Sequence, residues 1–413
     1  MTRLSKFLAS SLLGLLLAPP IFGASHFKVL YDFGATREGG VYPGGPPLLL
    51  NGNLYGTTYS GGDTGACEGY GCGTVFELTL ADGKIVEEII YEFHDNGDGA
   101  NPDCCLASDL TGNLYGTSRG AGVGASPIFE LSPSAGGWNF QAIYQPGGSP
   151  GLTVNRSGNI FGVIGGGVNN GAGALGELSP FDGVWNYAAL YSFCSQPHCA
   201  DGEPPYNPVS IDSKGNLYGT VYNGGEYGYG LAYELGRDPT DVLSAVWKYH
   251  VMHSFGAYPG DAGRSLAGLV PDGRGNAFGA GYNGGPNGYG VIYELKPSLE
   301  NPWMWDEVQL YGFSADLAQG GFPTGAMVMD KKGNLYGTNG GGPATCPGGV
   351  SCGMVYELSP TKSGPWTYTI LHIFNGTDGF VPNGLAIDEK GNLFGTTNEG
   401  GAYDDGVVFE ITP

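Results

Sequence analysis

Short apolar and aromatic runs, separated by glycine-rich breaks, recur along almost the whole chain. The clearest is the hexapeptide Gly-Asn-Leu-Tyr-Gly-Thr, which begins at Gly52, Gly112, Gly215 and Gly333 and has variants beginning at Gly158, Gly275 and Gly391. Successive starts lie 46 to 60 residues apart. β-branched and aromatic runs of this length, with no helical periodicity, predict strands rather than helices. The sequence therefore predicts seven units of one all-β repeat.

Each unit contains signals for four strands. The hexapeptide is followed by a second strand marked by a glutamate, which is Glu77, Glu130, Glu177, Glu234, Glu294, Glu357 or Glu410. A third strand comes next, and a short apolar run precedes the following hexapeptide. Asp212, Asp272, Asp330 and Asp388 each begin an Asp-x-x-Gly segment that ends on the first glycine of a hexapeptide, which suits a tight turn between antiparallel strands. We therefore expect a single seven-bladed β-propeller with four antiparallel strands per blade.

The two ends of the repeat complement each other. Residues 27–33 resemble the third strand of a unit, whereas residues 408–411 are the second strand of the last unit. Pairing these segments would close the last blade with the N-terminal strand and remove two exposed sheet edges. An open β-solenoid, the alternative, has little need for such complementarity, so we expect a closed ring.

The first residues have the pattern of an export signal. Arg3 and Lys6 precede an apolar stretch that is too short to span a bilayer and ends in small residues near Ala24. We expect a signal peptide over residues 1–23 and a propeller over residues 24–413, secreted or periplasmic, monomeric and without membrane insertion. Removing residues 1–23 changes the net charge from −22 to −24. So acidic a chain is repelled by phosphate backbones, which argues against nucleic-acid partners.

The repeat also resembles a known family. Residues 378–382 (Asp-Gly-Phe-Val-Pro), 391–396 (Gly-Asn-Leu-Phe-Gly-Thr), 400–401 (Gly-Gly) and 406–409 (Gly-Val-Val-Phe) follow the pattern of the GloVer tandem repeat of bacterial exported proteins. The resemblance covers nearly the whole mature chain. It implies a propeller-like repeat fold and export, and it implies no particular activity.

The eight cysteines fall in four close pairs: Cys67 and Cys72, Cys104 and Cys105, Cys194 and Cys199, and Cys346 and Cys352. In an exported protein such pairs predict local disulfides. A zinc site is the alternative, but the pairs lack a second pair or histidine at metal-binding spacing. Because Cys104 and Cys105 are adjacent, their pairing stays open: they bond to each other, bond elsewhere or remain reduced.

A residue type that recurs in every unit is interpreted as scaffold, and function is sought where the repeat breaks. Five of the six tryptophans lie six residues before the tyrosine or histidine of the third strand, which predicts packing roles. His253 and His372 replace that tyrosine, so we expect them to be packed or hydrogen-bonded there. The seven recurring glutamates do not form the unequal carboxylate pair that a glycosidase needs, and we interpret them as structural.

The loops between consecutive blades and those after each hexapeptide are expected on one face of the ring, and they contain every cysteine. These long, variable loops are the remaining candidate sites. Tyrosine interleaved with asparagine and glycine offers flat apolar rings beside hydrogen-bonding groups, which suits polar ligands such as glycans. The candidate ligand-binding residues are Tyr222, Asn223, Tyr227, Tyr229, Arg264, Tyr282, Asn283, Tyr289 and Trp303. We therefore expect a binding protein for a polysaccharide, cell-surface glycan or other surface polymer.

Two alternatives stay open beside the binding protein. One is a polysaccharide lyase or glycoside hydrolase at the propeller mouth, which would use His94 or His198 with tyrosine and Arg264; the sequence identifies no catalytic residue. The other is a structural envelope or matrix protein. No cofactor is expected, although Asp95 and Asp98 supply oxygen ligands suited to calcium.

Overall fold

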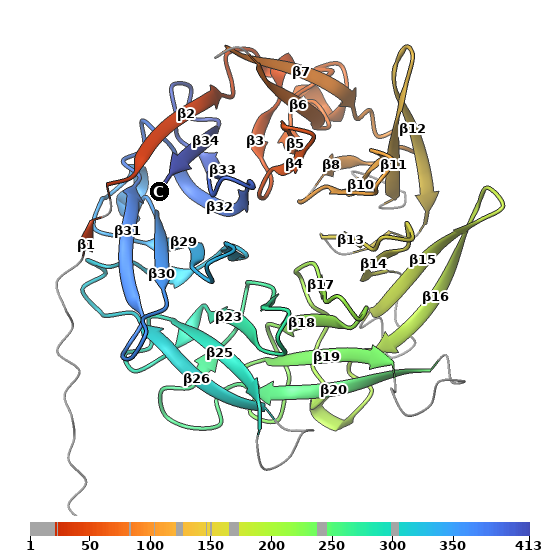
Figure 1. The fold of residues 1–413 in the computed structure, drawn as a ribbon. Coiled ribbons are helices and arrows are strands. Elements are labelled where there is room, and N and C mark those ends of the chain that lie inside the picture. The colour runs from red at the N-terminus through yellow and green to blue at the C-terminus, as the bar shows by residue number, and fades with distance from the viewer. Residues whose placement is uncertain are drawn as a thin grey trace, which may run out of the picture.

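The computed structural model describes residues 21–22, 24–81, 84–102, 104–120, 127–145, 147–148, 151–164, 173–237, 246–298 and 305–413. Within these residues, seven sheets of four or more strands stand around one central axis (Figure 1). The colour changes steadily around the ring in Figure 1, so each blade lies between the blades that precede and follow it in sequence. The predicted seven-bladed β-propeller is confirmed.

We number the blades from 1 to 7 in chain order. Blade 1 contains β3 (Val41–Pro43), β4 (Leu48–Leu50), β5 (Asn53–Ser60), β6 (Thr74–Ala81) and β7 (Lys84–Glu92). Blade 2 contains β8 (Ala100–Pro102), β9 (Ala107–Ser108), β10 (Leu114–Arg119), β11 (Ile128–Ser134) and β12 (Gly137–Tyr144). Blade 3 contains β13 (Thr153–Val154), β14 (Ile160–Val163), β15 (Ala174–Phe181) and β16 (Val184–Ser192). Blade 4 contains β17 (Ser210–Ile211), β18 (Leu217–Val221), β19 (Leu231–Arg237) and β20 (Trp247–Ser254).

Blade 5 contains β22 (Val270–Pro271), β23 (Ala277–Gly281), β25 (Val291–Pro297) and β26 (Trp305–Gly312), beside the small pair β21 (Ala262–Gly263) and β24 (Asn283–Gly284). Blade 6 contains β27 (Gly321–Pro323), β28 (Val328–Met329), β29 (Leu335–Gly341), β30 (Met354–Ser359) and β31 (Thr367–Ile373), with β1 (Ile21–Phe22) parallel to β31. Blade 7 contains β32 (Phe380–Ile387), β33 (Leu393–Glu399), β34 (Val407–Thr412) and β2 (His26–Asp32). The described helical segments are η1 (Arg37–Gly39), η2 (Cys67–Gly69), η3 (Pro197–Cys199) and η4 (Pro347–Gly349).

The two ends of the chain close the ring. Strand β2 pairs antiparallel with β34, with His26 opposite Thr412 and Tyr31 opposite Val408. Blade 7 is therefore built from both ends of the chain, as the sequence predicted. Of the predicted signal peptide, residues 1–20 and 23 lie outside the described residues. Within the described part of the chain, no helix has the length and apolar character needed to cross a membrane.

Counted from the central axis, the hexapeptide forms the second strand of each blade, and the strand with the recurring glutamate is the third. The polar residues of the hexapeptide stabilise the turn that precedes it. In blade 4, Asp212 Oδ1 accepts hydrogen bonds from the backbone N–H groups of Lys214 and Asn216 at 2.8 and 2.9 Å. Its Oδ2 accepts one from the Asn216 side chain at 3.1 Å. The same turn recurs at Asp272, Asp330 and Asp388. An aspartate that satisfies its own turn in this way stabilises the inner hairpin of the blade.

The remaining hexapeptide residues join the blades. Leu217 is fully buried, and Gly219 lets the ring of Tyr233 lie directly on the backbone, where a Cβ would collide with it. The Thr220 hydroxyl donates to the carbonyl of Ala267 in the next blade at 2.8 Å. Equivalent cross-blade bonds run from Thr57 to Cys104 and from Thr396 to Gly45. The hexapeptide thus recurs in this chain because its leucine, glycine and threonine make contacts within a blade or with the next blade.

At each blade junction, a side chain from the outer strand of one blade faces a side chain from the outer strand of the next. Four junctions are stacked ring pairs with parallel planes: Tyr91 and Phe140, Tyr191 and Tyr249, Tyr311 and Tyr368, and His372 and Phe27, with centroids 3.6 to 4.4 Å apart. A fifth pair, Tyr144 and Tyr187, is tilted at 5.1 Å. Such pairs contribute about 1 kcal/mol each beyond area burial. The two remaining junctions place a carboxylate in this position, with Glu87 beside Tyr31 and Glu307 beside His253.

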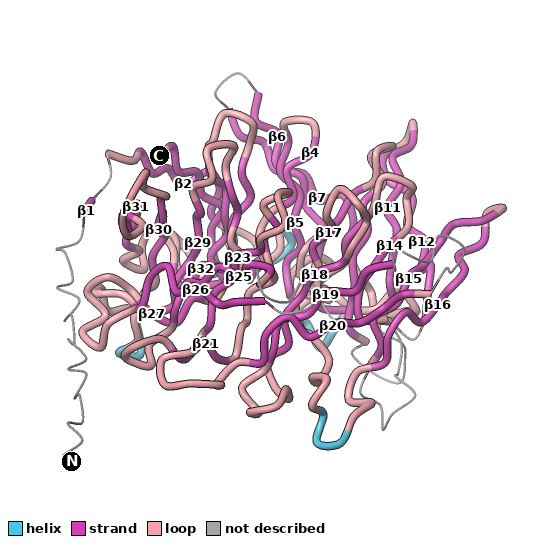
Figure 2. The backbone as a smooth tube through the Cα atoms, turned by 60° about the horizontal axis from the view of Figure 1, so that its bottom comes forward, coloured by secondary structure: helices cyan, strands magenta, loops and turns pink. Residues whose placement is uncertain are grey.

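Because the strands of a blade alternate in direction, the loops after the hexapeptides and the connections between blades emerge at one end of the ring. Figure 2 shows long loops with short helices at the lower edge, away from the C-terminus. We call this end the loop face. The segments η2 and η3, which contain Cys67 and Cys199, and η4, which follows Cys346, lie in these loops and connections. Loops on a rigid scaffold are the usual place for binding residues.

Candidate functional site

A central cavity of about 1050 Å³ lies between the inner strands of the blades. Much of its wall is apolar and comes from different blades, with Leu152, Leu269, Met327 and Ile387 as examples. A volume of this size and an apolar wall are typical of sites that take a small organic ligand. The cavity is therefore a candidate binding site for a small ligand.

Three partly exposed tyrosines line this cavity from the loop-face segments. Tyr42, Tyr59 and Tyr206 are 38%, 41% and 56% exposed, so each side chain is partly open to a ligand in the cavity. Asn207 and Glu399 line the same cavity and add hydrogen-bonding groups. Burial and then the neighbouring Asp405 carboxylate raise the pKa of Tyr42, so its hydroxyl stays protonated at neutral pH.

The Cys104–Cys105 disulfide also lines the cavity. The structure bonds the two adjacent cysteines to each other, which settles the pairing that the sequence left open. Gly45 has a positive φ of 95°, and a Cβ there would collide with Cys104 Sγ. The connection from blade 1 therefore packs tightly on the disulfide. This apolar sulfur surface is part of the cavity wall.

Five connections on the loop face contain a non-glycine residue with positive φ at an equivalent position. They are Tyr42, Asn101, Arg264, Phe322 and Val381, with φ between 49° and 59°. We call them the collar residues. Bulky residues rarely adopt this conformation, which costs of order 1–3 kcal/mol and is typical of ligand clamps. Their side chains differ from blade to blade, although the backbone around them repeats.

One hydrogen bond explains how each collar residue keeps this backbone. The collar N–H donates to a carbonyl of the preceding blade's loop, as from Arg264 to Tyr229 at 2.7 Å and from Phe322 to Tyr289 at 2.8 Å. The equivalent acceptors for Asn101 and Val381 are the carbonyls of Cys72 and Cys352. Two of the disulfides thus hold the loops that position collar residues.

The tyrosine-rich loops predicted from the sequence form two clusters, and none of their residues lines the central cavity. In the first cluster, Arg264 lies over the ring of Tyr222, with Cζ 5.6 Å from the centroid. Asn223 donates to Glu203 at 3.2 Å. Tyr227 and Tyr229 are 44% and 49% exposed, and the ring of Tyr229 packs against Gly256.

The second cluster lies one blade further along the ring. Tyr282 and Tyr289 both pack against Phe322, with ring centroids 5.2 and 5.5 Å apart. Asn283 belongs to the short strand β24 and pairs with Gly263. Trp303, the remaining candidate, lies outside the described residues. The structure thus brings Tyr222, Tyr229 and Arg264 together, and it brings Tyr282 and Tyr289 together in a separate group.

The sequence profile of the Gloeobacter/Verrucomicrobia repeat matches residues 145–409, well over half of the chain. The chain belongs to this family. The resemblance to the GloVer repeat seen in the sequence is thereby confirmed. A search among curated proteins finds no match.

Several solved structures resemble the Gloeobacter/Verrucomicrobia repeat protein at low identity. A protein from Lactobacillus plantarum is 14% identical, with 79% of this chain and 84% of that chain covered and a TM-score of 0.48. A Trypanosoma rangeli sialidase is 11% identical over 96% and 60% of the two chains, with a TM-score of 0.43. A gluconolactonase from Xanthomonas campestris is 14% identical over 95% and 90%, with a TM-score of 0.40. The site of the repeat protein must therefore be argued from its own residues.

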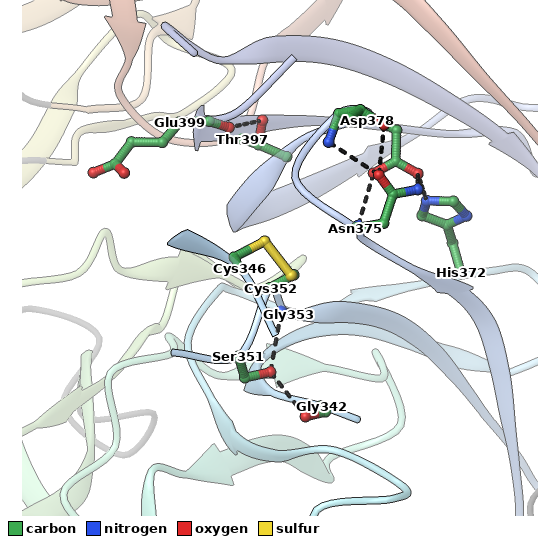
Figure 3. Close-up of a disulfide and its surroundings, with 11 residues drawn as sticks. Gly342, Cys346, Ser351, Cys352, Gly353, His372, Asn375, Asp378, Thr397 and Glu399 are labelled. Carbon is green, nitrogen blue, oxygen red and sulfur yellow. Dashed lines mark hydrogen bonds and ion pairs between the residues drawn. A yellow bond between two sulfur atoms is a disulfide. The ribbon is translucent and has the colours of Figure 1, made fainter. Parts of the chain in front are cut away.

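The other three cysteine pairs are also disulfides: Cys67–Cys72, Cys194–Cys199 and Cys346–Cys352. The predicted local pairing is confirmed, and no cysteine remains free. Figure 3 shows the Cys346–Cys352 bridge beside the loop of Asn375 and Asp378, whose carboxylate contacts His372. The bridge therefore stiffens the loop face next to the junction of blades 6 and 7.

The proposed calcium residues differ in their surroundings. Asp98 is buried, and its carboxylate accepts hydrogen bonds from the Tyr91 hydroxyl at 2.9 Å and from the backbone of His94 and Asn96. Asp201 and Asp378 occupy equivalent positions and accept equivalent bonds. Asp98 is therefore a repeated scaffold residue. Asp95 precedes it in a turn, with φ 54°.

The residues interpreted as scaffold have the expected contacts. Glu77 accepts hydrogen bonds from Tyr55 and Asn53 at 2.8 and 2.6 Å. Trp138 packs edge-on against Tyr55 of the preceding blade, and other tryptophans repeat this contact. His94 contacts Asp63 and Asp98, whereas Arg264 contacts Tyr222, so these contacts do not join His94 to Arg264. His198, the other histidine considered for a lyase, lies in η3.

One group was missed by the sequence reasoning. His253 is hydrogen-bonded, as expected, but its surroundings include both Asp261 and Glu307 within ion-pair distance. A signal was present, because Glu307 stands two residues after Trp305, where Phe140, Tyr187, Tyr249 and Tyr368 stand in other units. Comparing that position across the repeat would have marked Glu307 as a break in the pattern.

Proposed function

We propose that this protein is an exported binding propeller that takes a neutral saccharide at the loop-face end of its central cavity. The observation that carries the proposal is the group of three half-exposed tyrosines, Tyr42, Tyr59 and Tyr206, around an apolar cavity. The apolar face of a pyranose ring stacks on such aromatic faces, while its hydroxyl groups need the hydrogen-bonding partners that Asn207 and Glu399 offer.

Charge favours a neutral ligand over an acidic one. The whole chain has a net charge of −22, and Glu399 lies in the cavity wall. A polyanionic glycan would meet repulsion both at long range and inside the site. The collar residues supply differing side chains on a fixed backbone, which suits selection among related glycans. Export, a signal peptide over residues 1–23 and a monomeric state belong to this proposal.

The test is a glycan array, followed by calorimetric titration of the strongest hit with matched tyrosine variants. We expect Tyr206→Ala and Tyr59→Ala each to weaken binding by about tenfold, the scale of one lost aromatic contact. Tyr403→Ala is the matched control, because Tyr403 is 54% exposed and does not line the cavity.

The same titrations distinguish the cavity from the tyrosine-rich loops. Loss of binding in Tyr227→Ala and Tyr289→Ala, with Tyr206→Ala unaffected, would move the site to the clusters of blades 4 and 5. An array without any saccharide hit would reject the proposed ligand class.

A further inference from the structure

The junction of blades 4 and 5 contains a group of side chains that no other junction repeats among the described residues. His253 on β20 faces Glu307 on β26, and Asp261 joins them from the connection between the two blades. His253 Nε2 lies 3.0 and 3.2 Å from the two oxygens of Asp261 and 3.2 Å from Glu307 Oε2. One ligand atom from each residue lies within 4.8 Å of the others.

These three side chains are well shielded from solvent. The side chains of His253, Asp261 and Glu307 are 14%, 0% and 1% exposed. One imidazole N–H cannot satisfy three carboxylate oxygens at once. Both oxygens of Glu307 are buried without a hydrogen-bond partner of good geometry. A buried carboxylate in this condition is costly unless something pairs with it.

The charge of the three side chains in their metal-binding forms also favours a cation. A metal ion binds ionised carboxylates and a neutral imidazole, so its ligands must give up their protons. Two ionised carboxylates and a neutral imidazole carry a total charge of −2, which one divalent cation neutralises. Binding should therefore release protons and strengthen as the pH rises.

We propose that His253, Asp261 and Glu307 bind one divalent transition-metal ion of the Zn²⁺ or Mn²⁺ type between blades 4 and 5. One imidazole nitrogen and two carboxylates form a mixed nitrogen and oxygen donor set, which suits these ions better than Ca²⁺ or Cu⁺. Zn²⁺ binds such atoms at about 2.0–2.2 Å, so neighbouring donors in a tetrahedral shell lie about 3.3–3.6 Å apart. The separations of 3.0 and 3.2 Å from His253 Nε2 are slightly shorter, so small outward shifts of the side chains would admit the ion.

The backbone already orients one of the ligands. Asp261 Oδ1 accepts a hydrogen bond from its neighbour's N–H at Ala262 at 2.9 Å, and Oδ2 accepts one from Ala257 at 2.7 Å. Each carboxylate oxygen keeps a further lone pair for a metal. Outer contacts of this kind fix ligand geometry and increase affinity. Tyr258 on the same connection lies beside His253, with ring centroids 6.5 Å apart, and is itself 43% exposed.

The rest of the ring supplies two matched controls. At the junction of blades 6 and 7, His372 contacts Asp378 at 3.0 Å, but the third position is Phe27, which stacks on the imidazole. At the junction of blades 7 and 1, Glu87 occupies the position of Glu307, but its junction partner is Tyr31. The histidine–aspartate pair and the glutamate thus occur separately elsewhere and coincide at the proposed site.

The test is metal binding by the untagged full chain after treatment with a chelator. We expect calorimetry and elemental analysis to give one equivalent of Zn²⁺ or Mn²⁺ per chain, with a rise in the unfolding temperature at saturating metal. The isosteric variant Glu307→Gln should weaken binding at least a hundredfold. The control Glu87→Gln should bind as the natural protein does.

Either of two results would overturn the site. One is the absence of stoichiometric binding of any of these ions to the natural chain. The other is equal affinity in the natural chain and Glu307→Gln, which would place the metal elsewhere. Since Glu307→Gln removes a charge without changing shape, its folding can be checked independently by circular dichroism, and a folded variant without metal binding supports the proposal.

Discussion

Two junctions of the ring share a histidine–aspartate pair but differ in the third side chain that faces the histidine. Between blades 6 and 7, His372 contacts Asp378 and stacks on Phe27 with ring centroids 3.6 Å apart. Between blades 4 and 5, His253 contacts Asp261, but Glu307 replaces the aromatic ring. One junction is an aromatic stack, and the other is a buried cluster of titratable groups.

The difference shows how a repeat can acquire a site. Every junction needs a residue at this position to fill the space between blades, and an aromatic ring does so with favourable packing. A carboxylate fills the same space at a cost, because burying a charge needs a compensating partner. The change at Glu307 therefore lowers stability unless a ligand offsets it. Function and scaffold can be separated by comparing equivalent positions within one chain.

The largest expected effect comes from breaking the aromatic junction. Phe27→Ala removes the ring that stacks on His372 and also packs against Phe374 and Phe409. We expect a loss of about 3 kcal/mol in the free energy of unfolding, as for other aromatic truncations in packed regions. Urea denaturation measures it. A loss below 1 kcal/mol would mean that β2 contributes little to ring closure.

A smaller loss is expected from removing the disulfide beside that junction. Replacing Cys346 and Cys352 together by serine opens a loop of a few residues, which costs about 2 kcal/mol in the chain-entropy account. The carbonyl of Cys352 also accepts the hydrogen bond from Val381, so the Val381 amide should exchange faster with deuterium. The Phe322 amide, which bonds to the cysteine-free loop of Tyr289, is the internal control. Equal changes at both amides would contradict a local role for the bridge.

Converting the titratable junction into an aromatic one should increase stability when metal is absent. Glu307→Phe recreates the pair formed by His372 and Phe27 and removes a buried carboxylate from beside Asp261. We expect a gain of about 1–2 kcal/mol in chelator-treated protein. Chemical denaturation of both proteins with and without added Zn²⁺ measures it. A loss of stability in metal-free buffer would show that the carboxylate is already well satisfied.

The smallest effect concerns an ordinary junction and its pH dependence. Asp201 is buried, and hydrogen bonds from Ser195 and Tyr191 outweigh the effect of burial and lower its pKa below the usual 3.8. Its contribution to stability is therefore present above the pKa of the unfolded chain and is lost as the pH falls through the folded value. Asp201→Asn should therefore make the loss of stability in acid less steep. The midpoints of urea unfolding, measured at a series of decreasing pH values, test this. An unchanged acid profile would contradict this role.

The sequence predicted the fold because the repeat fixes every blade through local contacts. The Asp212 turn, the buried Leu217 and the Thr220 cross-blade bond all lie in or beside one hexapeptide, so seven copies specify seven blades. Ring closure also followed from the complementary ends. The bond between Cys104 and Cys105 could not be chosen from spacing alone, because several pairings were open to adjacent cysteines.

The candidate sites were harder to predict. The cavity wall comes from short inner strands of different blades, so Leu269 and Met327 form no pattern along the chain. The positive φ of Arg264 and Phe322 depends on hydrogen bonds to another blade's loop. The tyrosines of the glycine-rich loops were recognised, but their division into two clusters depends on which blade each loop faces. Glu307 is recognised as an exception only when the outer strands of the seven units are aligned, because the other aligned units mostly have an aromatic residue there.

The most direct test of the account is anomalous diffraction at the zinc absorption edge from crystals of the natural chain grown with Zn²⁺. The account predicts a peak bounded by His253, Asp261 and Glu307, and none where His372 and Asp378 meet Phe27. Peaks at both junctions, or none at the first, would contradict the claim that the exchange of one aromatic ring for a carboxylate creates the metal site.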